Sequence, residues 1–246
     1  MTSQRRPQDR QRLTEDAQPP RAPRLAINEV LGDAWLLYTR FIGRFFGLAA
    51  IVFGVLALVQ LIIDSSGNPG LLIISFVVSV VGIFWLQGAL VIAVDDARGR
   101  KPKLSLGEIF RRVEPVLWTL IAAGLLVAIG VAIGLLLLII PGLIVLTYLS
   151  MITPAIVLES RGMNEAFRRS IDLVSGDGLR VFIAITVILA AIFAVTIRAI
   201  LSPLPDLVGV YVATVVANSI SVPFVALSWT VMYFELRLNK DQSGGG

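Results

Sequence analysis

Long uncharged runs alternate with short charged segments along the chain, and this alternation predicts membrane-crossing helices. A helix needs about 20 apolar residues to cross the roughly 30 Å hydrocarbon core. Residues 115–158 form an uncharged run of 44 positions, which at about 1.5 Å per residue is long enough for two crossings. Four other runs have close to the length of a single crossing: 45–63, 71–94, 181–197 and 207–234. The pattern therefore predicts six transmembrane helices.

Glycine and proline refine this prediction in two of the runs. Pro141 and Gly142, in "IIPGL", are expected to make the tight turn that divides 115–158 into two helices. Gly130-x-x-x-Gly134, just before that turn, permits two helices to approach closely. Pro223 lies inside the last run and removes one helical hydrogen bond, so it predicts a kink that a neighbouring helix must accommodate.

The distribution of positive charge predicts how these helices are oriented. Six crossings place both termini on the same side of the membrane. The two terminal segments and the segments 95–114 and 159–180 together hold 20 of the 21 Lys and Arg residues, whereas the opposite loops hold only Arg198. Positive charge is enriched on the cytoplasmic side. Both termini are therefore expected in the cytoplasm.

A short amphipathic helix is predicted before the first, third and fifth crossings, and such helices lie in the headgroup plane of a membrane. The second of these helices begins with Ser105 and Glu108 in the spacing of a capping box, S-x-x-E. In the third helix, the apolar face is expected to hold Met163, Ala166, Phe167, Ile171 and Val174. In the first helix, it is expected to hold Ile27, Val30, Leu31, Ala34, Trp35 and Tyr38.

The three amphipathic helices also share a short sequence pattern, which predicts an internal repeat. Glu29, Glu108 and Glu165 occupy matching positions, and 15 residues after the first and third of these lie Arg44 and Arg180. We infer three repeats of an interfacial helix followed by a helical hairpin, at about 25–103, 104–160 and 161–239. The predicted fold is thus an all-α polytopic membrane protein with a six-helix domain at 25–239. Residues 1–24 are predicted to form a disordered cytoplasmic tail and residues 240–246 a flexible one.

Composition supports a membrane protein and argues against catalysis. Hydrophobic residues make up 56% of the chain and charged residues only 15%, far from the balance of a soluble domain. Histidine and cysteine are both absent, which removes the commonest general base, the commonest metal ligand and thiol chemistry. We therefore expect no enzyme activity, no cofactor and no metal site. Asp95 and Asp96 resemble a metal-binding pair but are expected to pair with their neighbours Arg98, Arg100 and Lys101.

The positive charges favour a membrane surface over nucleic acid as a partner. The net charge is +4, and the arginines lie at the edges of the apolar runs, where anionic lipid headgroups are the natural counterpart. Four arginines of the amphipathic helices are the candidate contacts with lipid or with a protein partner: Arg111, Arg112, Arg168 and Arg169. A use of 18 arginines against 3 lysines favours a bacterial source, and hence the plasma membrane.

Residues 154–182, "PAIVLESRGMNEAFRRSIDLVSGDGLRVF", carry a resemblance to a known family. The stretch resembles the signature of the bacterial integral-membrane family named for the membrane region of glycerophosphoryl diester phosphodiesterases, in which Pro-x-x-hydrophobic-x-Glu precedes an Ala-x-x-Arg-Ser helix. Ile171 stands where that family often has Trp. The resemblance extends over 25–239 and implies the membrane module without its catalytic domain, which needs histidines and a metal-binding carboxylate cluster. The matching residues are Pro154, Glu159, Glu165, Ala166, Arg169 and Ser170.

Three classes of function fit a chain of this kind. The first is a non-catalytic accessory, assembly or lipid-organising module that acts through its cytoplasmic interfacial helices. The alternative is a transporter or channel for a small or lipidic solute, whose cavity Asn218 and Ser219 would line beside Pro223. A membrane-embedded enzyme is the third class, and the absence of His and Cys argues against it. We expect the first.

Overall fold

The computed structural model describes residues 27–68, 70–99, 104–188 and 207–243, and within these ranges it is helical with no strand. A 3-10 turn, η1 (Glu114–Val116), joins α5 to α6, and a further apolar helical segment, Gly178–Ile188, follows α9. The helices are α2 (Ile27–Arg40), α3 (Ile42–Ser66), α4 (Leu71–Arg98), α5 (Leu106–Val113), α6 (Leu117–Leu137), α7 (Ile139–Leu149), α8 (Ile152–Glu159), α9 (Met163–Val174) and α11 (Leu207–Ser243).

Five helical stretches of the described residues are long and apolar enough to cross a membrane. They are Ile42–Ser66, Leu71–Arg98, Leu106–Leu137, Ile140–Glu159 and Tyr211–Gln242. The predicted fifth crossing, 181–197, is described only as far as Ile188, and its remainder lies outside the described residues. The predicted tail at 1–24 also lies outside them. The count of six crossings, the cytoplasmic termini and the threefold repeat therefore stay predictions.

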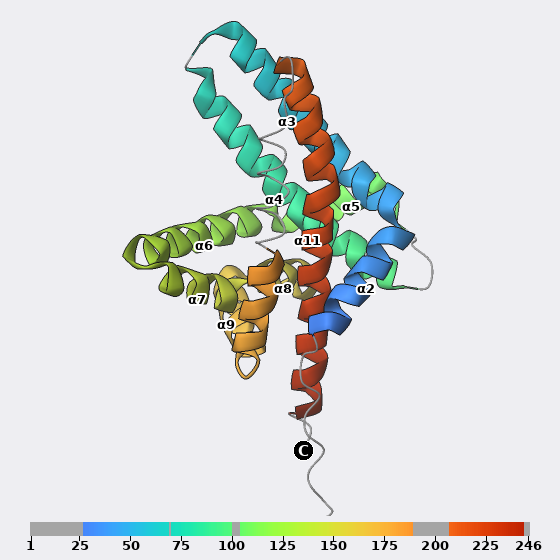
Figure 1. The fold of residues 1–246 in the computed structure, drawn as a ribbon, viewed down its shortest axis with the longest axis vertical. Helices are drawn as coiled ribbons and strands as arrows, with labels where there is room; N and C mark the ends of the chain where they lie inside the picture. The colour runs from blue at the N-terminus through green and yellow to red at the C-terminus, as the bar shows by residue number, and fades with distance from the viewer. Residues whose placement is uncertain (1–26, 69, 100–103, 189–206, 244–246) are drawn as a thin grey trace, which may run out of the picture.

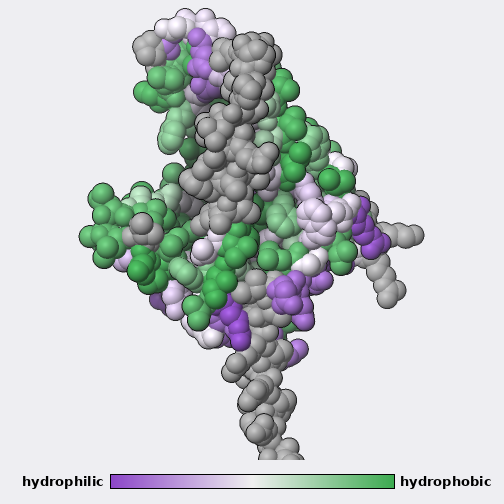
Figure 2. Space-filling model, viewed as in Figure 1, coloured by the Kyte–Doolittle hydropathy of each residue, from purple (hydrophilic) through white to green (hydrophobic). Residues whose placement is uncertain are grey.

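Two helical hairpins and one long helix define the architecture (Figure 1). The α3–α4 hairpin and the α6–α7 hairpin extend in different directions, and α11 packs against α2, α3, α4 and α9. Hydrophobic side chains cover the α6–α7 hairpin, whereas hydrophilic ones gather around α9 and at the tip of the α3–α4 hairpin (Figure 2). The buried core lies where the short helices α2, α5, α8 and α9 meet α4 and α11.

The turn between α6 and α7 lies three residues before the expected position. Leu138 makes it, with an extended backbone (φ −168°, ψ 152°). Pro141 instead lies in the first turn of α7, where a missing N–H costs no helical hydrogen bond. Gly142 brings the two helices together, because an added Cβ on Gly134 would lie only 2.7 Å from the Gly142 Cα. The predicted hairpin is present, but the Pro-Gly pair starts its second helix and does not make its turn.

Two glycines of α6 should respond differently to alanine. Gly134→Ala forces the backbones apart, and we expect it to cost about 1–3 kcal/mol of stability. Gly130→Ala is the matched control, because its Cβ would meet Val145 Cγ1 at an ordinary 3.6 Å and alanine is the better helix former. Thermal unfolding in detergent should therefore show a lower midpoint for Gly134→Ala only. Equal midpoints for the two variants would contradict this close approach.

The long helix α11 continues across Pro223 to Ser243, so residues 240–243 are helical and not part of the flexible tail that we expected. Helix α2 contacts α11 next to the proline. The Tyr38 hydroxyl donates a hydrogen bond to the Ile220 carbonyl at 2.9 Å, one turn before Pro223. The Phe224 ring packs edge-on against Tyr38, with 5.9 Å between centroids. Burial raises the pKa of the Tyr38 hydroxyl, which keeps the proton that it donates.

Candidate functional site

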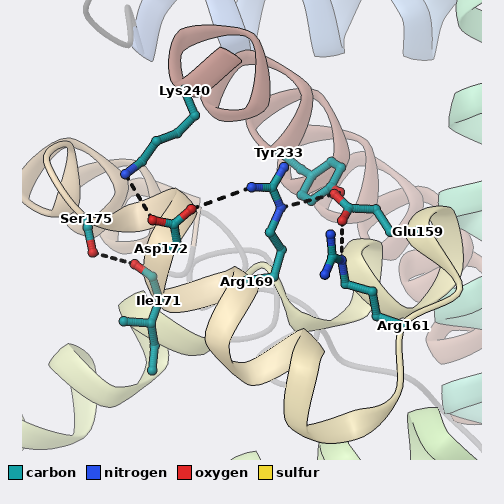
Figure 3. Close-up of polar contacts among 8 residues, drawn as sticks. All are labelled: Glu159, Arg161, Arg169, Ile171, Asp172, Ser175, Tyr233 and Lys240. Carbon is teal, nitrogen blue, oxygen red and sulfur yellow. Dashed lines mark hydrogen bonds and ion pairs between the residues drawn. The ribbon is translucent and has the colours of Figure 1, made fainter. Parts of the chain in front are cut away.

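The polar residues of the signature stretch meet those of α11 in one cluster, which we call the α8–α9 junction (Figure 3). It joins the end of α8, the second half of α9 and the last turns of α11. Seven residues make up the junction: Glu159, Arg161, Arg169, Ser170, Asp172, Tyr233 and Lys240.

Ser170 forms hydrogen bonds with the backbone at a break in the fourth membrane-length stretch. Helix α7 ends at Leu149 and α8 begins at Ile152, so the helical hydrogen-bond ladder is interrupted between them. The hydroxyl of Ser170 donates to the Tyr148 carbonyl at 2.7 Å and accepts from the Met151 N–H at 3.1 Å. Ser170 is completely buried, where unpaired backbone groups are costly. A single side chain of α9 thus satisfies backbone groups on both sides of the break.

Glu159 is the acceptor on which three elements converge. Its side chain is only 9% exposed. Arg161 Nε and the Tyr233 hydroxyl both donate to its carboxylate, and Arg169 Nε lies 3.3 Å from Oε1 (Figure 3). Ser160 has the left-handed conformation (φ 49°) that often ends a helix, and this turns the chain back toward Glu159. The carboxylate therefore ties the α8–α9 loop, α9 and α11 together.

A second carboxylate extends the α8–α9 junction toward the end of α11. Asp172 Oδ1 lies 3.1 Å from Lys240 Nζ, and Asp172 Oδ2 lies 3.5 Å from Arg169 Nη1. Arg169 thus links Glu159 to Asp172, and Asp172 links α9 to the last residues of α11. Among the described residues, no group of three or more acidic side chains could hold a metal ion. The contacts of the junction hold helices in place.

The buried face of α9 is rotated relative to the predicted face. Ala166, Ser170, Leu173 and Val174 are buried, whereas Ile171 is 45% exposed. The polar Ser170 takes an inward position because its hydroxyl has two backbone partners. Ile171, at the position where the resembling family often has Trp, points outward.

Helix α5 is capped at its first end and bonded to α4 near its other end. The predicted capping box is confirmed: the Glu108 N–H donates to Ser105 Oγ at 3.3 Å, and the Ser105 N–H donates to Glu108 Oε2 at 2.7 Å. At the other end, Trp85 Nε1 of α4 donates to the Phe110 carbonyl at 3.0 Å. The amphipathic helix is therefore packed against α4 in a defined orientation.

The arginines that we matched in the predicted repeat make different contacts. Arg44 Nη1 lies 2.7 Å from Asp96 Oδ2, and Arg44 also donates to the Leu104 carbonyl just before α5. Arg180 Nη1 pairs instead with the nearby Asp177 at 2.6 Å. Asp96 thus forms an ion pair as expected, and Arg44 is one of its partners. Arg100 and Lys101, two of the basic neighbours that we named, lie outside the described residues.

The glutamates of the same pattern also differ in their surroundings. Glu108 is part of the capping box of α5, whereas Glu29 and Glu165 are exposed in the first turns of α2 and α9. Matching positions in the sequence therefore do not carry matching contacts in the structure.

The four candidate lipid contacts divide into two kinds. Arg111, Arg112 and Arg168 are exposed and form no ion pair within 4.0 Å with any described residue. Arg169 is only 19% exposed and is held by Glu159 and Asp172. Its role as a contact with lipid or with a protein partner stays a prediction. The local sequence pattern could not show that Arg168 and Arg169 differ in exposure, because Arg169 is covered by partners that include residues distant in the sequence.

The candidate cavity pair lies on α11. Ser219 is completely buried, and its hydroxyl oxygen has no hydrogen-bond partner among the residues that the structure describes. Asn218 is half-buried. The pair stays a candidate for solute contact. Tyr233 was missed at the sequence level, since it lies 74 residues from Glu159 and no local pattern marks it.

Comparison with known proteins identifies a family over the second half of the chain. The family model described as "Domain of unknown function (DUF7847)" matches residues 105–236, from the capping box of α5 into the last part of α11. No curated protein and no solved structure matches the chain. The match gives no link to the phosphodiesterase-associated family that the signature resembles. Because it covers 132 of the 246 residues, the chain belongs to the DUF7847 family.

Proposed function

We propose that this protein is a non-catalytic integral membrane protein that organises anionic lipids on the cytoplasmic side of the bacterial plasma membrane. One observation carries the proposal. Arg111, Arg112 and Arg168 are exposed and free of ion pairs with described residues, on helices whose other faces are packed into the protein. Basic residues held near an anionic leaflet attract its headgroups.

The packing of α5 and α9 supports a fixed position for these arginines. The capping box and the Trp85 hydrogen bond hold α5, and the α8–α9 junction holds α9. Because the helices that carry these arginines are already held in place, binding a lipid has a smaller entropic cost. Three large apolar side chains lie close to these arginines in the sequence and are also exposed: Trp118 by 75%, Ile171 by 45% and Leu179 by 74%. Such exposure is expected of residues that insert at the boundary between headgroups and acyl chains.

Three features of the sequence support the remaining parts of the proposal. The chain has no histidine and no cysteine, so the commonest general base and the thiol nucleophile are missing. The basic segments lie on the side that the positive-inside rule assigns to the cytoplasm. The resemblance to the membrane region of glycerophosphoryl diester phosphodiesterases supports a membrane module.

Neutralising the three arginines tests the proposal. Each basic residue near an anionic surface contributes about 1 kcal/mol, so Arg111→Gln/Arg112→Gln/Arg168→Gln should lower the affinity for anionic lipid by up to about 150-fold. The measurement is native mass spectrometry of the full chain from mixed micelles, which counts retained phosphatidylglycerol against phosphatidylcholine.

A charge-matched control separates position from net charge. Arg5→Gln/Arg6→Gln/Arg10→Gln removes the same three charges from the N-terminal segment and should leave lipid retention unchanged. Equal loss in the two triple variants would show a nonspecific charge effect and contradict the proposal. A protein partner that co-purifies stoichiometrically and is lost with the α5 and α9 arginines, with lipid retention unchanged, would replace lipid by protein as the ligand.

A further inference from the structure

The outward surface of α5, η1 and α6 changes in character along its length. Arg111 and Arg112 are exposed in the last turn of α5, and Trp118 is 75% exposed at the start of α6. Beyond Trp118, exposed aliphatic residues recur at intervals of about one or two helical turns: Leu125, Ile129, Ile133 and Leu136. We call this row, from Arg111 to Leu136, the α5–α6 stripe.

The dimensions of the α5–α6 stripe match those of a lipid molecule. Trp118 and Ile129 are 11 residues apart, which is about 16 Å along a helix and about half of the hydrocarbon thickness. Arg111 lies about 10 Å from Trp118 in the direction opposite to Ile129. Its long side chain can therefore reach the headgroup layer. Tryptophan prefers the boundary between these two layers.

We propose that the α5–α6 stripe binds one anionic glycerophospholipid, with its phosphate held by Arg111 and Arg112. The indole of Trp118 lies at the level of the glycerol esters, and one acyl chain follows Leu125 and Ile129. Guanidinium groups suit this ligand, because their planar fork donates two parallel hydrogen bonds to phosphate oxygens. The inference rests on the proposed function and names the lipid contact that α5 makes.

Two acidic neighbours of the arginines sharpen the inference. The carboxylate of Glu108 accepts the Ser105 N–H at the start of α5, on the side of Arg111 that lies away from Trp118. Glu114 is exposed at the start of η1, between the arginines and Trp118. A carboxylate at that level repels a phosphate. Glu114→Gln should therefore increase the retention of anionic lipid, whereas neutralising the exposed Glu29 of α2, which is not close in sequence to any of the three arginines, should not.

A conservative exchange separates this inference from the broader proposal. Arg111→Lys/Arg112→Lys keeps both charges and removes the guanidinium fork. We expect the retention of phosphatidylglycerol to fall about tenfold in native mass spectra of the full chain. This is the change in affinity expected when one charge-assisted hydrogen bond is lost. Trp118→Ala should lower retention as well. If both variants retain the lipid and the triple glutamine variant loses it, the proposed function stands and the α5–α6 stripe is wrong.

Photo-crosslinking locates the acyl chain independently of affinity. The probe is phosphatidylglycerol with a diazirine in the middle of one acyl chain, incorporated with the full-length protein into nanodiscs. Peptide mapping should place the adducts on residues 118–129, and Arg111→Gln/Arg112→Gln should remove them. Adducts distributed over α3, α4 and α6 alike, or unchanged in that variant, would overturn the inference.

Discussion

Replacing Ser170 with alanine is expected to destabilise the protein more than any other single hydroxyl deletion in its described part. The change removes the hydrogen bonds to the Tyr148 carbonyl and the Met151 N–H, and the site is completely buried. Each buried backbone group left without a partner costs about 1–3 kcal/mol, so the total is about 2–6 kcal/mol. The measurement is the thermal unfolding midpoint in detergent, which should fall clearly.

Ser175 provides the control for this prediction. Its hydroxyl donates at 2.6 Å to the Ile171 carbonyl of its own helix, in an exposed position, where water can replace the lost partner. Ser175→Ala should therefore leave the midpoint nearly unchanged. If Ser170→Ala is equally harmless, the break between α7 and α8 does not depend on α9.

Glu159→Gln is expected to have the second largest effect. A glutamine keeps the size of the side chain but removes the charge that faces Arg161 and Arg169. Removing one partner of a buried ion pair costs about 3–5 kcal/mol, and we expect the lower end of this range because Arg161 is 37% exposed and partly screened by water. The thermal midpoint should fall, and proteolysis should cut the α8–α9 loop more readily.

A double substitution tests whether the loss comes from unpaired arginine. Glu159→Gln/Arg169→Gln leaves less uncompensated charge than Glu159→Gln alone, so part of the stability should return. Glu165→Gln on the exposed side of α9 is the charge-matched control and should be neutral. A double variant less stable than the sum of its singles would contradict a pairing between Glu159 and Arg169.

The features predicted correctly from the sequence are those set by local pattern. Five of the six crossings predicted from hydropathy are membrane-length helical stretches in the structure, because the bilayer requires long apolar runs. The capping box of α5 was predictable, since both of its partners lie within four residues. The turn at Leu138 was displaced from the prediction because Pro141 is equally well placed in the first turn of a helix.

The features that were missed depend on contacts between distant segments. Tyr233 reaches Glu159 across 74 residues. Ser170 turns inward because a break in another helix offers it two backbone partners, and this rotation leaves Ile171 exposed. The same long-range contacts separate the half-buried Arg169 from the exposed Arg168. Periodicity alone could not have shown either difference.

For the proposed function, the arginines of α5 and α9 must face the cytoplasm, on the side opposite the tip of the α3–α4 hairpin. The chain has no cysteine, so single cysteines can report each side directly. Ser65→Cys at the hairpin tip and Ser175→Cys after α9 are matched exposed replacements. In right-side-out vesicles, a membrane-impermeant maleimide should label Ser65→Cys only, and inverted vesicles should show the reverse. Labelling of both variants from one side, or of Ser175→Cys from outside, would contradict the account.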